Sequence, residues 1–147
     1  MIPRAPLILG IVGLAPFLWG ALTLGSSDLA TWSVLTLGTR FSGPFLPLSY
    51  GQIILAFMSG ILWGFASRTH GSRAAVGYTL SVLPVIWVFV MVGSGPASSA
   101  VYLIAGFIAV LGLDWSFWRQ GLAPEWWMRL RILLTLVVVA CLSLLVI

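Results

Sequence analysis

Few side chains in this sequence could do chemistry, and the acidic ones are the scarcest. The chain of 147 residues holds only three of them. Asp114 lies deepest within an apolar stretch, where a buried carboxylate is a usual sign of proton transfer or ion conduction. Its simpler role is a salt bridge to an arginine that follows it, namely Arg119, Arg129 or Arg131. We expect the salt bridge, and proton handling is the alternative.

The residues that hold metals or act as nucleophiles occur singly. His70, the only histidine, lies in a short polar segment and cannot alone provide the two axial ligands that hold a haem iron. Cys141, the only cysteine, lies in the last apolar stretch and can form neither an internal disulfide nor a zinc cluster. The sequence also lacks a Ser-His-Asp arrangement, a glycine-rich phosphate loop and carboxylates at metal-ligand spacing. We therefore predict no enzyme activity and no catalytic, cofactor-binding or metal-ligating residues.

The other polar groups within the apolar stretches are neutral. They are Tyr50, Gln52, Ser59, Tyr78, Thr79, Ser81, Tyr102, Thr135 and Ser143. Gln52 is placed to bond across to a neighbouring helix, and such bonds contribute about 0.6 kcal/mol on average in membrane proteins. Contact with a bound ligand is the alternative role.

The composition shows which elements must position these residues. Hydrophobic residues make up 61% of the chain, charged residues 7%, and the mean hydropathy is +1.13. A soluble domain could not cover its surface with so few charges. Five continuous apolar stretches approach the roughly 20 residues that a membrane-crossing helix needs: residues 5–24, 46–66, 74–92, 97–115 and 126–147. The sequence predicts an all-α integral membrane protein, with a single domain of five transmembrane helices over residues 1–147.

Glycine, serine and proline mark the breaks between the stretches. The longest connection, residues 26–47, opens with a serine cap followed by leucine and tryptophan at helical spacing. We expect a short helix over residues 28–38 that lies in the membrane interface, with a loop packed over the bundle as the alternative. Pro16 and Pro84 lie inside the first and third stretches, and each should kink its helix by removing a backbone hydrogen bond.

The arginines predict the orientation. Six of the seven fall on the side shared by the N-terminus and the second and fourth connections: Arg4, Arg68, Arg73, Arg119, Arg129 and Arg131. Only Arg40 falls on the other side. The positive-inside rule therefore places the N-terminus inside and the C-terminus outside. Topology alone explains this basic rim, and the alternative is that Arg68, Arg73, Arg119, Arg129 and Arg131 bind anionic lipid headgroups. Glu125 is also spaced to pair with Arg129 at the start of the fifth stretch.

Small residues at four-residue spacing predict where helices touch, because membrane helices associate through close packing. They recur in the second stretch at Ala56, Gly60 and Gly64, and in the first stretch Gly13, Pro16 and Gly20 share one helix face. We expect packing within the chain, and a homodimer face is the alternative.

Tryptophan is abundant, with eight in the chain. Trp115, Trp118, Trp126 and Trp127 bracket the fourth connection, as an aromatic belt would. We expect interface anchoring and core filling, and a stack of rings that holds a quinone or another flat ligand is the alternative.

Three segments resemble a known family. They comprise Tyr50, Phe57, Gly60, Trp63 and Gly64 in the second stretch, Pro124, Trp126 and Arg131 at the start of the fifth, and Gly10, Gly13, Leu14, Pro16 and Phe17 in the first. All three are similar to a domain-of-unknown-function family of small inner-membrane proteins that includes transmembrane protein 69. Ser59 stands where that family usually has the first glycine of a pair. The resemblance implies a multi-span protein of bacterial or mitochondrial inner membranes, and it implies no activity.

The expected function follows from small size, absent catalytic groups and several small-residue faces. We expect a non-catalytic accessory or assembly subunit of a larger membrane complex, such as a respiratory one. Its partners would be membrane lipids and other integral membrane subunits, and not nucleic acid. The alternative is a small lipid- or quinone-binding protein or a small-molecule carrier, which requires a cavity at membrane depth. An arginine-only composition rich in alanine and glycine favours a bacterial inner membrane over a mitochondrial one.

Overall fold

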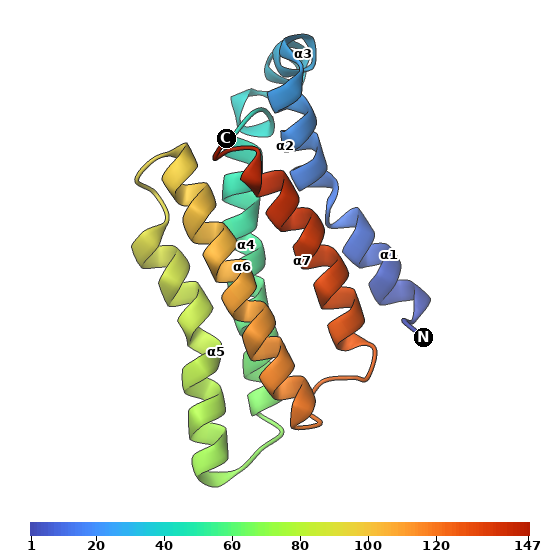
Figure 1. Ribbon diagram of the computed structural model, residues 1–147, viewed down its shortest axis with the longest axis vertical. Helices are drawn as coiled ribbons and strands as arrows, with labels where there is room; N and C mark the ends of the chain where they lie inside the picture. The colour runs from blue at the N-terminus through green and yellow to red at the C-terminus, as the bar shows by residue number, and fades with distance from the viewer.

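The computed structural model describes residues 1–147, and its regular structure is entirely helical (Figure 1). The elements are α1 (Arg4–Val12), α2 (Ala15–Gly25), α3 (Ser27–Leu37), the 3-10 helix η1 (Thr39–Phe41), α4 (Phe45–Ala66), α5 (Gly71–Met91), α6 (Pro96–Arg119) and α7 (Trp127–Ser143). The predicted all-α class is confirmed. The long helices form a bundle, and α3 lies across one of its ends.

Four segments are long and apolar enough to cross a membrane: Arg4–Gly25, which joins α1 and α2, and the single helices α4, α5 and α6. The last helix, α7, has 17 residues, which span about 26 Å, slightly less than a hydrocarbon core of roughly 30 Å. The predicted stretch 126–147 was too long at its end, because α7 stops at Ser143 and a turn follows. The bundle therefore has four candidate spans and one shorter apolar helix.

The first apolar stretch is broken near its middle. α1 ends at Val12 and α2 begins at Ala15, with Gly13 and Leu14 between them. Pro16 is the second residue of α2, and its missing N–H cannot continue the hydrogen-bond ladder of α1. The kink predicted at Pro16 is therefore confirmed. After the break, α2 packs on α4, whereas α1 lies beside α7 (Figure 1).

The core lies where α2, α4, α6 and α7 meet. Its fully buried members are Phe17, Leu55, Leu103, Phe107, Val110 and Leu142. Two glycines, in α6 and α5, permit a close approach to α4. A Cβ atom on Gly106 of α6 would lie 2.8 Å from Leu55 Cδ1, and one on Gly77 of α5 would lie 2.9 Å from the Cβ of Ala66. Both glycines therefore bring their helices against α4, which lies at the centre of the bundle.

A hydrogen bond joins the middles of α4 and α5. The backbone N–H of Val85 donates to the Ser59 hydroxyl at 3.0 Å, and Val85 directly follows Pro84, which lies inside α5. Ser59 and Pro84 are both buried. An interhelical bond in such surroundings has no competing water. Ser59 therefore bonds to the neighbouring helix at the position where the resembled motif usually carries a glycine.

The small-residue stripe of α4 does not pack within the chain. Ala56, Gly60 and Gly64 are all exposed, and a Cβ atom on either glycine would meet nothing within 4 Å. The prediction of intramolecular packing there was wrong, because the buried face of α4 carries other residues, namely Pro47, Gly51, Leu55, Met58, Ser59, Leu62 and Ala66. Gly20 of α2 does pack, since a Cβ atom on it would lie 2.6 Å from the Pro47 ring.

The short helix expected over residues 28–38 is present as α3. The Ser26 hydroxyl caps it by accepting from the N–H of Leu29 at 3.4 Å. The indole N–H of Trp19 on α2 donates to the Ser33 hydroxyl at 3.2 Å and to the Phe41 carbonyl at 3.1 Å. These bonds fix α3 and η1 against the end of α2.

Different segments of the chain lie at the two ends of the bundle (Figure 1). The N-terminus and the α4–α5 and α6–α7 connections lie at one end, and α3, the α5–α6 connection and the C-terminus lie at the other. Six arginines therefore belong to the first end, and Arg40 of η1 belongs to the second.

Candidate functional site

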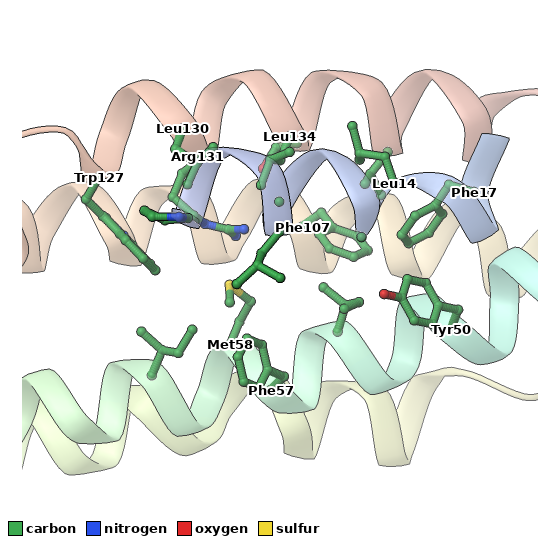
Figure 2. A pocket seen from close by; sticks show the side chains of 18 residues that line it. Leu14, Phe17, Tyr50, Phe57, Met58, Phe107, Trp127, Leu130, Arg131 and Leu134 are labelled. Atoms are coloured by element: carbon green, nitrogen blue, oxygen red, sulfur yellow. The ribbon is translucent and has the colours of Figure 1, made fainter. Parts of the chain in front are cut away.

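A cavity of about 400 Å³ lies between the N-terminal helices and the rest of the bundle. Its walls come from α1, α2, α4, α6 and α7, and 13 of its 18 lining residues are hydrophobic. Cavities of roughly 300–1,000 Å³ with mostly apolar walls are typical of small-molecule sites. Figure 2 shows α7 along one side of the space and α4 along the opposite side.

The break in the first stretch explains why this space is not filled. α1 packs on α7 rather than on α4. A Cβ atom on Gly10 would lie 3.0 Å from Leu134 Cδ1, so this glycine permits the close approach of α1 to α7. Gly13, at the break, lines the cavity without a side chain that could fill it. Leu9 and Phe57 also line the cavity, yet they are 71% and 61% exposed. The cavity is therefore open at the outer surface between α1 and α4, and its mouth is apolar.

A buried ion pair forms one end of the cavity wall. The Arg131 Nε donates to Asp114 Oδ2 at 2.7 Å, and the Trp127 indole N–H donates to Asp114 Oδ1 at 2.9 Å. The side chains of Arg131 and Asp114 are only 6% and 1% exposed. Both carboxylate oxygens have donors, which offsets much of the cost of removing the charge from water. The salt bridge expected for Asp114 is confirmed, and its partner is Arg131.

Two buried polar atoms of the cavity residues have no hydrogen-bond partner. They are Arg131 Nη2 and Thr135 Oγ1, one helical turn apart on α7. Nearly all buried polar groups in proteins are paired, and leaving one unpaired costs about 1–3 kcal/mol. The guanidinium lies beside the central space in Figure 2. These two groups are therefore available to a molecule that enters the cavity.

A third polar group lies at the other end of the space. The Tyr50 hydroxyl points into the cavity from α4 (Figure 2). The Tyr50 ring packs edge-on against Phe17, with ring centroids 5.4 Å apart, and Phe17 packs against Phe107 in the same way at 6.2 Å. Gln52, by contrast, donates to the Leu48 carbonyl of its own helix at 3.3 Å, so the bond that we predicted to a neighbouring helix was wrong.

The exposed arginines connect the loops at the basic end. Arg68 Nη1 donates to the Leu122 carbonyl at 2.8 Å, and Arg73 Nε donates to Gln120 Oε1 at 3.1 Å. The first bond joins the α4–α5 connection to the loop after α6, and the second joins the first turn of α5 to the residue that follows α6. Part of the predicted rim therefore holds these neighbouring segments of the chain together.

The structure corrects two expectations about the start of α7. Arg131 does not belong to the exposed rim with Arg119 and Arg129, because it is buried against Asp114. The predicted pair between Glu125 and Arg129 is not formed, since the salt bridge between Arg131 and Asp114 is the only one in the chain. The helix begins after Glu125, at Trp127.

Sequence reasoning missed the polar face of α7, although a signal was present. Trp127, Arg131 and Thr135 follow one another at four-residue intervals and so lie on one face of an otherwise apolar helix. An ionisable residue inside such a helix is itself a sign of function. We assigned Arg131 to the rim because it falls on the side shared by the N-terminus and the second and fourth connections.

The residues that carry the family resemblance divide between the cavity and the outer surface. Tyr50, Phe57 and Arg131 line the cavity. Trp63 is half exposed and packs against Tyr78, with ring centroids 4.5 Å apart and planes tilted by 46°. The others lie outside the cavity, with Trp126 against Trp127 and with Gly60, Gly64 and Pro124 exposed.

Comparison with known proteins places the chain in a family. The model of the family described as "Protein of unknown function (DUF3429)" matches residues 2–147. The chain belongs to the DUF3429 family. Transmembrane protein 69 of Xenopus tropicalis is 28% identical to this DUF3429 chain over 141 residues, which cover 93% of the chain and 51% of the relative. The chain thus spans about half the length of that curated relative. No solved structure matches it.

Proposed function

We propose that this DUF3429 protein binds a lipid-like molecule, such as a membrane lipid or a quinone, in the cavity between α1, α4 and α7, and that it does so without catalysis. One observation carries the proposal: a cavity with mostly apolar walls contains two buried polar atoms, on Arg131 and Thr135, that the protein itself leaves unpaired. The apolar mouth at Leu9 and Phe57 gives such a molecule a route from the bilayer.

We also propose how the chain lies in the membrane. The chain crosses five times, with α7 as the fifth and shortest crossing, the N-terminus inside and the C-terminus outside. The gathering of six arginines at one end of the bundle supports this orientation. A bacterial inner membrane is the proposed location. The ion pair then lies near the cytoplasmic side, five residues before the end of α6 and four after the start of α7.

A matched pair of variants tests the binding proposal. Ile54 lines the cavity, whereas its neighbour Ile53 is 55% exposed and does not. Ile54→Trp fills the space, and Ile53→Trp adds the same ring to the outer surface. Native mass spectrometry after mild detergent extraction should find a retained ligand on the wild type and on Ile53→Trp, and none on Ile54→Trp. Equal retention by all three proteins, or none by the wild type, would contradict the proposal. Circular dichroism checks that both variants fold.

A second function, as an accessory or assembly subunit of a larger membrane complex, is supported by a different observation. The small-residue stripe Ala56, Gly60 and Gly64 faces outward, and in membranes such stripes allow another helix to approach closely. Copurification of a stoichiometric partner with the wild type, and its loss with Gly60→Leu, would support this function. A protein that purifies alone in every mild detergent would count against it.

A further inference from the structure

We propose, on the basis of the binding function above, that the ligand is a neutral lipophile with a carbonyl oxygen, and that Arg131 and Thr135 donate hydrogen bonds to this oxygen. A quinone ring and the ester of an acylglycerol share this chemistry. These two donors therefore also determine which headgroups the cavity rejects.

The donor geometry favours an acceptor on the ligand. The Nε of Arg131 already donates to Asp114 at 2.7 Å. Its Nη2 has no partner, and a guanidinium nitrogen can only donate. The Thr135 hydroxyl also lacks a partner, and it can donate as well. Two unpaired donors one turn apart on the same helix face suit a single oxygen acceptor.

The charge of the site favours a neutral acceptor over an anion. Asp114 already neutralises Arg131, and no other arginine lines the cavity. A carboxylate or phosphate beside this pair would add a net negative charge to an apolar space, which is costly. A carbonyl oxygen would satisfy the same donors without adding any charge. The exposed arginines of the rim remain available to anionic headgroups outside the cavity.

The walls next to the donors suit a flat or unbranched apolar group. Trp127 and Arg131 project from α7, and Met58 and Phe57 face them from α4 (Figure 2). Aromatic faces and a thioether pack well against a ring or an acyl chain. From this end an apolar tail can continue toward Phe17, or leave through the mouth beside Phe57.

Three probes with straight alkyl tails of nine or ten carbons distinguish the headgroups: decyl-benzoquinone, monodecanoylglycerol and ionised decanoate. Each is titrated calorimetrically into the full chain in detergent micelles. Wild type should bind the quinone, the acylglycerol or both more tightly than decanoate, and the order of the two neutral probes shows which source the site prefers. Tighter binding of decanoate would overturn the inference.

Thr135→Val tests the recognition without disturbing the fold, because the Thr135 hydroxyl has no protein partner to lose and the two side chains have nearly the same shape. It should weaken binding of the preferred neutral probe about tenfold, the larger effect expected for loss of one hydrogen bond. Thr79→Val is the matched control, since Thr79 is exposed on α5 and bonds only to its own helix. Arg131→Lys keeps the charge beside Asp114 and should also weaken binding.

The variants separate failure of this inference from failure of the proposed function. Unchanged affinity in both Thr135→Val and Arg131→Lys, together with loss of binding in Ile54→Trp, would overturn the recognition and leave the cavity as the binding place. Unchanged affinity in Ile54→Trp would overturn the proposed function itself.

Discussion

The buried pair between Asp114 and Arg131 allows a quantitative test of how α6 and α7 are held together. Asp114→Leu leaves a guanidinium buried without its counter-ion and removes the acceptor of Trp127. Arg131→Met leaves the carboxylate with only the indole donor. Removing one partner of a buried pair typically destabilises a protein by about 3–5 kcal/mol. The full figure applies here, because the side chains of Asp114 and Arg131 are only 1% and 6% exposed to solvent screening.

The double variant Asp114→Leu with Arg131→Met should be far less damaging than the two single variants together. It removes both charges and places apolar side chains in the core, so the remaining defect is the unpaired indole N–H of Trp127, worth about 1–3 kcal/mol. The coupling free energy between the two sites should therefore be at least about 3 kcal/mol, at the upper end of what contacting residues show.

The assay is reversible unfolding in mixed micelles of increasing SDS content, followed by far-ultraviolet circular dichroism. Arg129→Met is the control, since Arg129 lies on the same helix but is exposed and makes no salt bridge, and it should change stability by less than about 0.5 kcal/mol. Additive single effects, with a coupling below about 0.5 kcal/mol, would refute the claim that these side chains form one buried unit.

Three other predictions concern packing and topology. Gly20→Ala places a Cβ atom 2.6 Å from the Pro47 ring and should cost about 1–3 kcal/mol in the same unfolding assay, whereas Gly60→Ala meets nothing and should not destabilise. Ser59→Ala leaves the Val85 N–H without its partner in α4 and should lower the free energy of unfolding by about 1–3 kcal/mol. A decrease below about 0.5 kcal/mol would show that the bond is unimportant for stability. Reporter fusions should place the two termini in opposite compartments, and a common compartment would contradict the five crossings.

Much of the fold could be predicted from the sequence because it depends on local properties. The bounds of α4, α5 and α6 agree with the predicted stretches to within four residues at each end, since long apolar runs end at glycine and proline clusters. The kink near Pro16 and the short helix after Ser26 were predictable for the same reason. The prediction failed at the end of α7, where the sequence stays apolar after the helix has stopped.

The candidate site could be predicted only in part, because it depends on which helix faces meet. A salt bridge for Asp114 followed from the scarcity of charges, but the choice of Arg131 depends on how α6 crosses α7. The stripe Ala56, Gly60 and Gly64 was assigned to the interior by its spacing, and spacing alone does not tell which face turns inward. The cavity results from the packing of α1 on α7, and Gly10 permits that approach without specifying which neighbouring helix α1 contacts.

Photo-crosslinking in native membranes tests the central claim, that the cavity admits a lipophilic molecule, most directly. Decyl-benzoquinone and monodecanoylglycerol that carry a diazirine in the tail are activated by light, and the modified residues are mapped by peptide mass spectrometry. We predict adducts at the cavity residues Ile54, Leu134 and Val138 that excess unlabelled probe suppresses. Adducts from both probes only at outward-facing residues such as Ile53 and Leu136, unaffected by competition, would contradict it.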